Sequence, residues 1–230
     1  TTGEEPKRRA SIGVEAALLM TVFFFGTNFT AVKIVVESVP PILFAATRFT
    51  LAGCLLLLFL PFLEPGSRLR REDFLAVLGL GVVGVTLTQT VFTIGVSLTT
   101  AANTALVYST APVWGMLLGF TLGLERPRLA GILGIGLSLL GVGFIVYGGL
   151  EFAGTSLVGD ALILLAAVFW GSYTVLSLSL LKRYSPVALA AYAMTLGGLA
   201  AFPLAALVPG GFDVGSLDGL TWAAAAYSAL

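Results

Sequence analysis

The sequence predicts an all-α integral membrane protein, and two observations carry that prediction. Hydrophobic residues make up 57% of the 230 residues and charged residues only 10%, whereas soluble domains contain about 25% charged residues. Apolar stretches of roughly 20 residues, the length that crosses a bilayer as a helix, follow one another along the chain. Since an open backbone in lipid lacks hydrogen-bond partners, these stretches are expected to be helices with the lipid bilayer as their main partner.

Seven apolar segments are long enough to span, and an eighth begins near residue 219. The first segment is too long for a cleavable signal peptide and carries Asn28 and Lys33, so we expect it to remain in the protein. The expected spans are 14–36, 41–62, 74–97, 100–122, 129–149, 159–181 and 186–208.

The basic residues predict the orientation. Ten of the twelve Lys and Arg residues lie outside the spans, in the segments "KRR" at 7–9, "RLRR" at 68–71, "ERPR" at 125–128 and "KR" at 182–183. All four segments fall on the same side of the expected spans. The positive-inside rule places that side, and with it the N-terminal segment 1–13, in the cytoplasm.

The chain also contains an internal repeat at an offset of 145 residues. This shift places "EAALLMTVFFFGTNF" over "DALILLAAVFWGSYT", Pro41 over Pro186, Thr50 over Thr195 and Gly53 over Gly198. Five spans separate the two copies, and an odd number inverts the second copy across the membrane. We therefore expect a first five-helix unit at 14–149, an extracytoplasmic linker at 150–158 and a second unit at 159–230.

Inverted repeats are the sequence signature of transporters. Completing the second unit would require the remainder of the eighth span and two more helices. We therefore expect a ten-helix inverted-repeat (5+5) transporter fold, of which this chain holds seven complete spans and the start of an eighth.

Composition and residue types argue against several other functions. The net charge is zero, so no nucleic-acid partner is expected. The chain has no His and a single cysteine, Cys54, and no pair of buried carboxylates. An intramembrane enzyme would need a nucleophile with a base or paired acids, so no enzyme activity, cofactor or metal is expected.

Polar residues within the spans are the candidate substrate-binding residues. By helical rise, Asn28, Arg48, Gln89 and Tyr108 lie about 10–12 Å below the outer ends of four different spans. Arg48 has no acid within the visible spans to pair with, so its charge requires water, backbone carbonyls, an acid on a helix beyond this chain or an anionic ligand. For Gln89 and Asn28, hydrogen bonds that tie helices together are an equal alternative.

Four further residues belong to the candidate set. Lys33 and Asn103 lie closer to the outer membrane surface, and Lys33 could instead extend to the lipid headgroups. Trp170 and Tyr173 flank Gly171 near the middle of the membrane, where either could pack against a neighbouring helix or stack on a substrate.

Gly and Pro residues predict how spans four and five pack. Gly115, Gly119 and Gly123 recur every fourth residue, and the fifth span is rich in Gly, which favours close helix–helix packing. Pro112 cannot donate a backbone hydrogen bond and therefore predicts a kink near Tyr108.

Several stretches resemble the EamA-type family of the drug/metabolite transporter superfamily. The similar segments are "FFFGTNFTAVK", "PPILFAATRFTLAGCLLLL", "TQTVFTIGVSLTTAANTALVYSTAPVWGMLLG" and "LERPRLAGILGIGLSLLGVGFIV". Phe25 stands where the family has Trp before the first Gly, although the second unit has Trp170 before Gly171. The resemblance implies ten helices in two inverted units and the export of amino acids, related metabolites or drugs.

The expected function is therefore a transporter in the bacterial inner membrane that exports amino acids or related small metabolites, with a substrate that carries an anionic group. A multidrug permease, a channel-like uniporter, a membrane subunit without transport activity and a homodimer are left open.

Overall fold

The computed structural model describes residues 5–124, 129–149, 156–207, 213, 215 and 217–229, and every element within these ranges is helical. In chain order the elements are α1 (Glu5–Val36), α2 (Pro41–Leu63), the 3-10 turn η1 (Arg71–Asp73), α3 (Phe74–Gly81), the π-helical turn η2 (Val82–Leu87), α4 (Thr88–Leu98), α5 (Ala101–Tyr108), α6 (Ala111–Thr121), α7 (Leu129–Gly149), α8 (Leu157–Leu180), α9 (Pro186–Ala206) and α10 (Gly219–Ala229).

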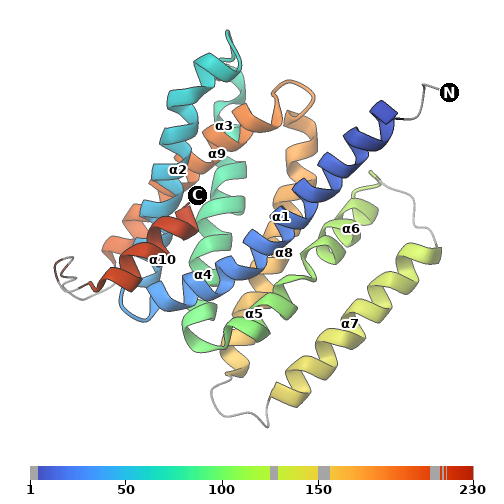
Figure 1. The fold of residues 1–230 in the computed structure, drawn as a ribbon, viewed down its shortest axis with the longest axis vertical. Helices are drawn as coiled ribbons and strands as arrows, with labels where there is room; N and C mark the ends of the chain where they lie inside the picture. Colours follow the sequence, from blue (N-terminus) through green and yellow to red (C-terminus); the bar gives the residue numbers. More distant parts are fainter. Residues whose placement is uncertain are drawn as a thin grey trace.

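Five of the described helical stretches are long and apolar enough to cross a membrane: Leu19–Val36, Pro41–Leu63, Arg71–Leu98, Leu157–Leu180 and Pro186–Ala206. They coincide with five of the expected spans. The two other expected spans are occupied by the pair α5 and α6 and by α7 (Figure 1). An all-α, multi-pass membrane protein is thus confirmed.

Helices α2 and α9 pack along each other at one side of the molecule. Ser185, before α9, donates to Glu64, after α2, and Pro41 at the start of α2 shares a small cavity with Ala205 at the end of α9. The two helices are therefore antiparallel. Helix α8 lies between α4 and α6, and α1 crosses to meet α10, α4 and α5 (Figure 1).

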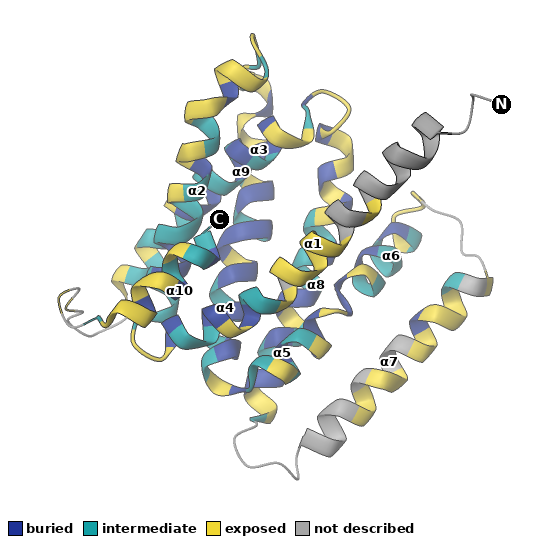
Figure 2. Ribbon diagram, viewed as in Figure 1, coloured by how far each residue is buried: buried dark blue, intermediate teal, exposed yellow. Residues whose placement is uncertain are grey.

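The buried side chains gather where α1, α2, α4, α5 and α8 meet, and the outward faces of the helices stay apolar and exposed (Figure 2). Phe29, Phe44, Phe92 and Ile163 are at most 5% exposed. Exposed apolar side chains include Leu19, at 72%. This pattern of a packed centre and an apolar exterior suits a helix bundle surrounded by lipid.

Span three is one long helix that contains a π-helical turn, η2. The Thr88 hydroxyl donates to the Val83 carbonyl at 2.7 Å, five residues earlier, and the Thr86 hydroxyl crosses to the Gly197 carbonyl of α9 at 2.6 Å. Such single π turns occur most often at functional positions. The turn changes the rotation about the helix axis of the residues that follow it, among them Gln89.

Span four is interrupted where a kink was expected. Helix α5 ends at Tyr108, Ser109 and Thr110 form a turn, and α6 begins at Ala111 with Pro112 in its first turn. The missing N–H of Pro112 removes the hydrogen bond that would have joined the two helices. The span is therefore divided into two short helices rather than bent.

The expected close packing through glycine is found in α6 and is absent from much of α7. A Cβ on Gly171 of α8 would lie 2.5 Å from the backbone nitrogen of Gly115, so these two helices touch through their backbones. In α7, no described atom lies within 4 Å of a Cβ built on Gly134, Gly136 or Gly141. For these three residues the predicted packing is not observed within the described part of the chain.

Candidate functional site

Arg48 lies on α2 and extends toward α1. Its Nη2 is 3.5 Å from the Asn28 side-chain oxygen, and its guanidinium carbon is 5.1 Å from the centre of the Phe49 ring and 5.9 Å from that of Phe44. The ion pairs found among the described residues lie elsewhere and do not include it. A partly buried cation is thus surrounded by neutral partners.

Tyr108, the last residue of α5, completes this group. It is 6% exposed, its ring packs edge-on against Phe92 at 5.1 Å and against Phe29 at 6.1 Å, and it lies near the Arg48 side chain. The break after α5 ends the helix at this residue. The structure therefore brings together Asn28, Arg48 and Tyr108, from three different helices.

A cavity of about 520 Å³ opens beside Arg48, between the end of α1, the first half of α2 and α10. Arg48 is the only charged residue that the described chain contributes to its wall, and Thr47 contributes the one hydroxyl. That hydroxyl donates to the Leu43 carbonyl at 2.9 Å. Phe44, Trp222 and aliphatic side chains form the rest of the wall, so the wall is almost entirely apolar.

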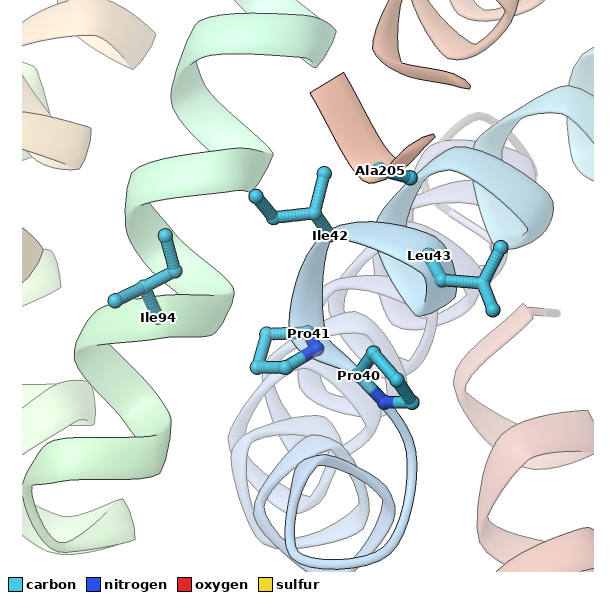
Figure 3. A pocket seen from close by; sticks show the side chains of 6 residues that line it. All are labelled: Pro40, Pro41, Ile42, Leu43, Ile94 and Ala205. Atoms are coloured by element: carbon cyan, nitrogen blue, oxygen red, sulfur yellow. The ribbon is translucent and has the colours of Figure 1, made fainter. Parts of the chain in front are cut away.

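A second cavity, of about 160 Å³, lies at the start of α2 (Figure 3). Pro40, Pro41, Ile42, Leu43, Ile94 and Ala205 line it. Its wall presents no charged or hydroxyl side chain among the described residues, so it offers nothing that would orient a polar substrate.

Gln89 is 8% exposed, two residues after the π-helical turn. No hydrogen bond to its side-chain amide occurs within the described ranges. Thr86, Thr93 and Ser97, which the sequence places on the same face, instead donate to backbone carbonyls. The polar face of span three therefore satisfies most of its own hydroxyls, and among the described residues it leaves the Gln89 amide and the buried Thr90 hydroxyl without a hydrogen bond.

Lys33 binds the end of a neighbouring helix. Its Nζ donates to the carbonyls of Val96 at 2.9 Å and Ser97 at 3.1 Å, in the last turn of α4. A cation at a helix C-terminus is favoured because it meets unpaired carbonyls and the negative end of the helix dipole. The ammonium thus has protein partners at the C-terminal end of α4.

Asn103 belongs to a buried group that the sequence analysis missed. Its side-chain nitrogen donates to Asp160 at 3.3 Å, and the Thr99 hydroxyl donates to the other carboxylate oxygen at 2.6 Å. Asp160 is only 3% exposed and lies in the first turn of α8, where the helix dipole favours an anion. The signal was present, since Asp160 falls over Glu15 in the repeat, but an acid at the edge of a span looks solvent-exposed.

Trp170 and Tyr173 stack on each other, with ring centres 5.1 Å apart. The Tyr173 ring also lies directly against Gly84, where a Cβ would meet it at 2.1 Å. No hydrogen bond or ring contact joins either residue to Arg48 in the part of the chain that is described. Their observed contacts are those of helix packing between α8 and η2.

Comparisons with known proteins agree with this architecture. Residues 13–147 and 157–230 match the model of the EamA-like transporter family. An uncharacterized transporter of Archaeoglobus fulgidus is 31% identical over 186 residues, 81% of this chain and 65% of that protein. The uncharacterized transporter YetK of Bacillus subtilis is 27% identical, over 96% of this chain and 68% of its own length.

The chain therefore spans about two thirds of the length of these relatives. A solved crystal structure also shares the fold, with a TM-score of 0.54 and 21% identity over 88% of this chain and 77% of the other. The matched family indicates a transporter rather than an enzyme, consistent with the apolar spans and the cavity beside Arg48. The chain belongs to the EamA-like transporter family.

Proposed function

We propose that this protein exports amino acids or related small metabolites that carry an anionic group, by alternating access between two inverted repeats, with its N-terminus in the cytoplasm of a bacterial cell. The observation that carries the proposal is Arg48, a cation within an apolar span, beside a cavity of about 520 Å³ and among neutral partners.

The energetics favour a ligand for this cation. A charged side chain at the centre of a bilayer costs about 2.5–3.5 kcal/mol or more, and a long hydrogen bond to Asn28 compensates little of that cost. A carboxylate can accept two parallel hydrogen bonds from one guanidinium. An anionic substrate would therefore supply the partner that the described protein does not.

The inverted repeat is supported by a reciprocal contact between α2 and α9. A Cβ on Gly53 would lie 2.5 Å from the Thr195 hydroxyl, and a Cβ on Gly198 would lie 2.5 Å from the Thr50 hydroxyl. Thr50 and Gly53 fall over Thr195 and Gly198 at the offset of 145 residues. Two units related by a two-fold axis make such paired contacts, each residue touching the counterpart of the other.

A multidrug permease is the second candidate, and the apolar wall of the cavity favours it. Such a protein would accept apolar molecules with or without an anionic group. The two candidates therefore differ in how much the anionic group contributes to transport.

The experiment is a transport assay with the full-length protein in proteoliposomes. Matched pairs of compounds, each a carboxylate and its neutral amide, are tested for uptake and efflux. We expect transport of the carboxylate to exceed that of its amide. Equal transport of both members of every pair would favour the multidrug permease, and transport of no compound would leave the exporter proposal without support.

A further inference from the structure

One end of the α2–α9 pair is sealed by apolar side chains. Between α3, the end of α8 and the start of α9, five residues are at most 7% exposed, and Tyr173, Tyr192 and Leu196 pack around them. We call this group the sealed cluster; its buried members are Val77, Leu80, Leu180, Tyr184 and Leu189.

At the opposite end, the same residue positions border a cavity. At the offset of 145 residues, the counterparts of the five buried members are Trp222, Ala225, Val35, Val39 and Phe44. All five line the cavity of about 520 Å³ beside Arg48. Equivalent parts of the two repeats thus form a closed cluster at one end and border a cavity at the other, where Val35 and Phe44 remain at most 5% exposed.

Hydrogen bonds and an ion pair stabilise the sealed end. Asp73, 5% exposed, accepts from Arg183 at 2.5 Å and from the Tyr184 hydroxyl at 2.8 Å. The Tyr184 oxygen in turn accepts the backbone N–H of Arg70 at 3.1 Å. These contacts join the loop after α2 to the loop after α8, which lie side by side at the top of Figure 1.

Two more hydrogen bonds join the same loops. Ser185 donates to the Glu64 carboxylate at 2.5 Å, and the Tyr192 hydroxyl donates to the Ser67 carbonyl at 3.4 Å. At the open end, Val39 and Thr47 stand in place of Tyr184 and Tyr192. Neither can make the bonds of a phenol that reaches across to a neighbouring loop.

We propose that Asp73, Arg183 and Tyr184 form the gate at the end of the protein that bears the basic loops. In the state described, the gate is shut and the cavity beside Arg48 is open at the other end. Passage of the substrate requires the Asp73 contacts to break, the sealed cluster to part and the opposite end to close. This inference rests on the proposed alternating access.

The test measures access to each end without any substrate. In a Cys54→Ser background, single cysteines replace Leu196, at the sealed cluster, or its counterpart Leu51, at the cavity. Each reporter is reacted in proteoliposomes with a membrane-impermeant thiol reagent present on both sides. The gate is weakened by Asp73→Asn, which removes the charge, or by Tyr184→Phe, which removes only the hydroxyl.

We expect either gate variant to raise the labelling rate at residue 196 about tenfold, the scale of losing a hydrogen bond to a charged group, and to lower the rate at residue 51. Glu72→Gln is the matched control, because the ion pair of Glu72 within the described chain is with Arg70 and both side chains are exposed; it should change neither rate. Thermal unfolding shows that each variant is folded.

Two results would overturn the gate. An unchanged labelling rate at residue 196 would show that the Asp73 contacts do not control access to the sealed cluster. A higher labelling rate at residue 196 without a lower rate at residue 51 would show that the sealed cluster loosens without any change at the opposite end. Because labelling needs no substrate, its outcome is separate from that of the transport assay. If the labelling rate rises at residue 196 and falls at residue 51 in a protein that transports none of the compounds, the gate proposal stands and the proposed substrates are wrong.

Discussion

At the scale of single residues, Arg48 and Lys33 have the same charge and different surroundings. Arg48 has a neutral side chain, Asn28, and aromatic rings as its neighbours, whereas Lys33 donates to two carbonyls at the end of α4. The sequence identified both as intramembrane cations. It could not separate them, because their partners come from other helices.

We predict that substitution of Arg48 lowers the affinity of the protein for anionic substrates. Arg48→Lys should impair their transport, because Lys offers a point charge in place of a planar fork, and Arg48→Ala should impair it more. Losing a charge-assisted hydrogen bond costs about 1.5–3 kcal/mol, roughly a ten- to hundredfold weaker apparent affinity. Substrate-concentration curves in proteoliposomes measure this.

Neutral analogues should be far less sensitive to the Arg48 variants. Arg68→Ala serves as the control, since Arg68 is an exposed loop residue and its removal should leave transport unchanged. If Arg48→Ala transports carboxylates and amides in the wild-type ratio, Arg48 has a structural role.

For substitution of Lys33, we predict that the protein loses stability and that its selectivity between carboxylates and amides does not change. Lys33→Met retains the apolar stem and removes the charge that caps α4. A cation at a partly buried helix C-terminus contributes up to about 2 kcal/mol, so the midpoint of thermal unfolding should fall. A changed ratio of carboxylate to amide transport, with the midpoint unaltered, would instead assign Lys33 to the substrate.

At the scale of helices, the sequence predicted where most spans lie but only some of the interruptions within them. Hydrophobic length located most of the spans to within a few residues of their observed ends, because lipid imposes that length directly; α1 is the exception, since it begins at Glu5, well before the expected span at 14–36. Pro112 indicated a defect in span four, and the structure has a complete break there. The π-helical turn at Val82–Leu87 had no comparable signal, since it depends on how α3 and α4 pack against α8 and α9.

The glycines of α7 and α8 give a prediction about packing. Gly171→Ala would place a methyl group 2.5 Å from the Gly115 nitrogen and 2.8 Å from the Ala111 carbonyl, and backbone cannot move aside as a side chain can. Overpacking of this kind costs about 1–3 kcal/mol. We expect a lower midpoint of thermal unfolding and less folded protein in membranes.

Gly136→Ala is the matched variant, because no described atom lies within 4 Å of a Cβ at that position. Replacing Gly with Ala in a helix favours the helix by about 0.8–1.0 kcal/mol, so this variant should unfold at the same temperature or higher. Equal destabilisation by both variants would show that α7 is as closely packed as α8.

At the scale of the whole molecule, the repeat in the sequence and the contacts in the structure are consistent with each other. The offset of 145 residues was derived from matching Pro, Gly and Thr residues, and the same offset relates the sealed cluster to the lining of the open cavity. The sequence could not show that the two ends differ in conformation. The proposed gate attributes that difference to one state of the protein, and the two ends also differ in residue type, since Val39 and Thr47 stand in place of Tyr184 and Tyr192.

The site itself was only partly predictable for a related reason. Depth along each helix suggested that Asn28, Arg48 and Tyr108 lie at one level, because residues at one level of a bundle can face a shared interior. Depth does not specify rotation about the helix axis. Trp170 and Tyr173 are at a suitable depth, and yet their observed contacts lie along the seam between α8 and η2.

The last prediction concerns the axis that would relate the two repeats. Gly53→Ala places a methyl group 2.5 Å from the backbone nitrogen and hydroxyl of Thr195, and Gly198→Ala places one 2.6 Å from the nitrogen and 2.5 Å from the hydroxyl of Thr50. If α2 and α9 are related by a two-fold axis, the two variants disturb equivalent contacts. Each should lower the free energy of unfolding by about 1–3 kcal/mol, and the two losses should be nearly equal.

Thermal or denaturant unfolding of the two single variants and the double variant measures this. Because the two contacts lie one turn apart on the same helix pair, a methyl group that separates α2 from α9 at one contact also relieves the other. The double variant should therefore lose less than the sum of the single losses. A large loss from one variant and none from the other would show that the two contacts are not equivalent, and the inverted-repeat interpretation of the α2–α9 pair would fail.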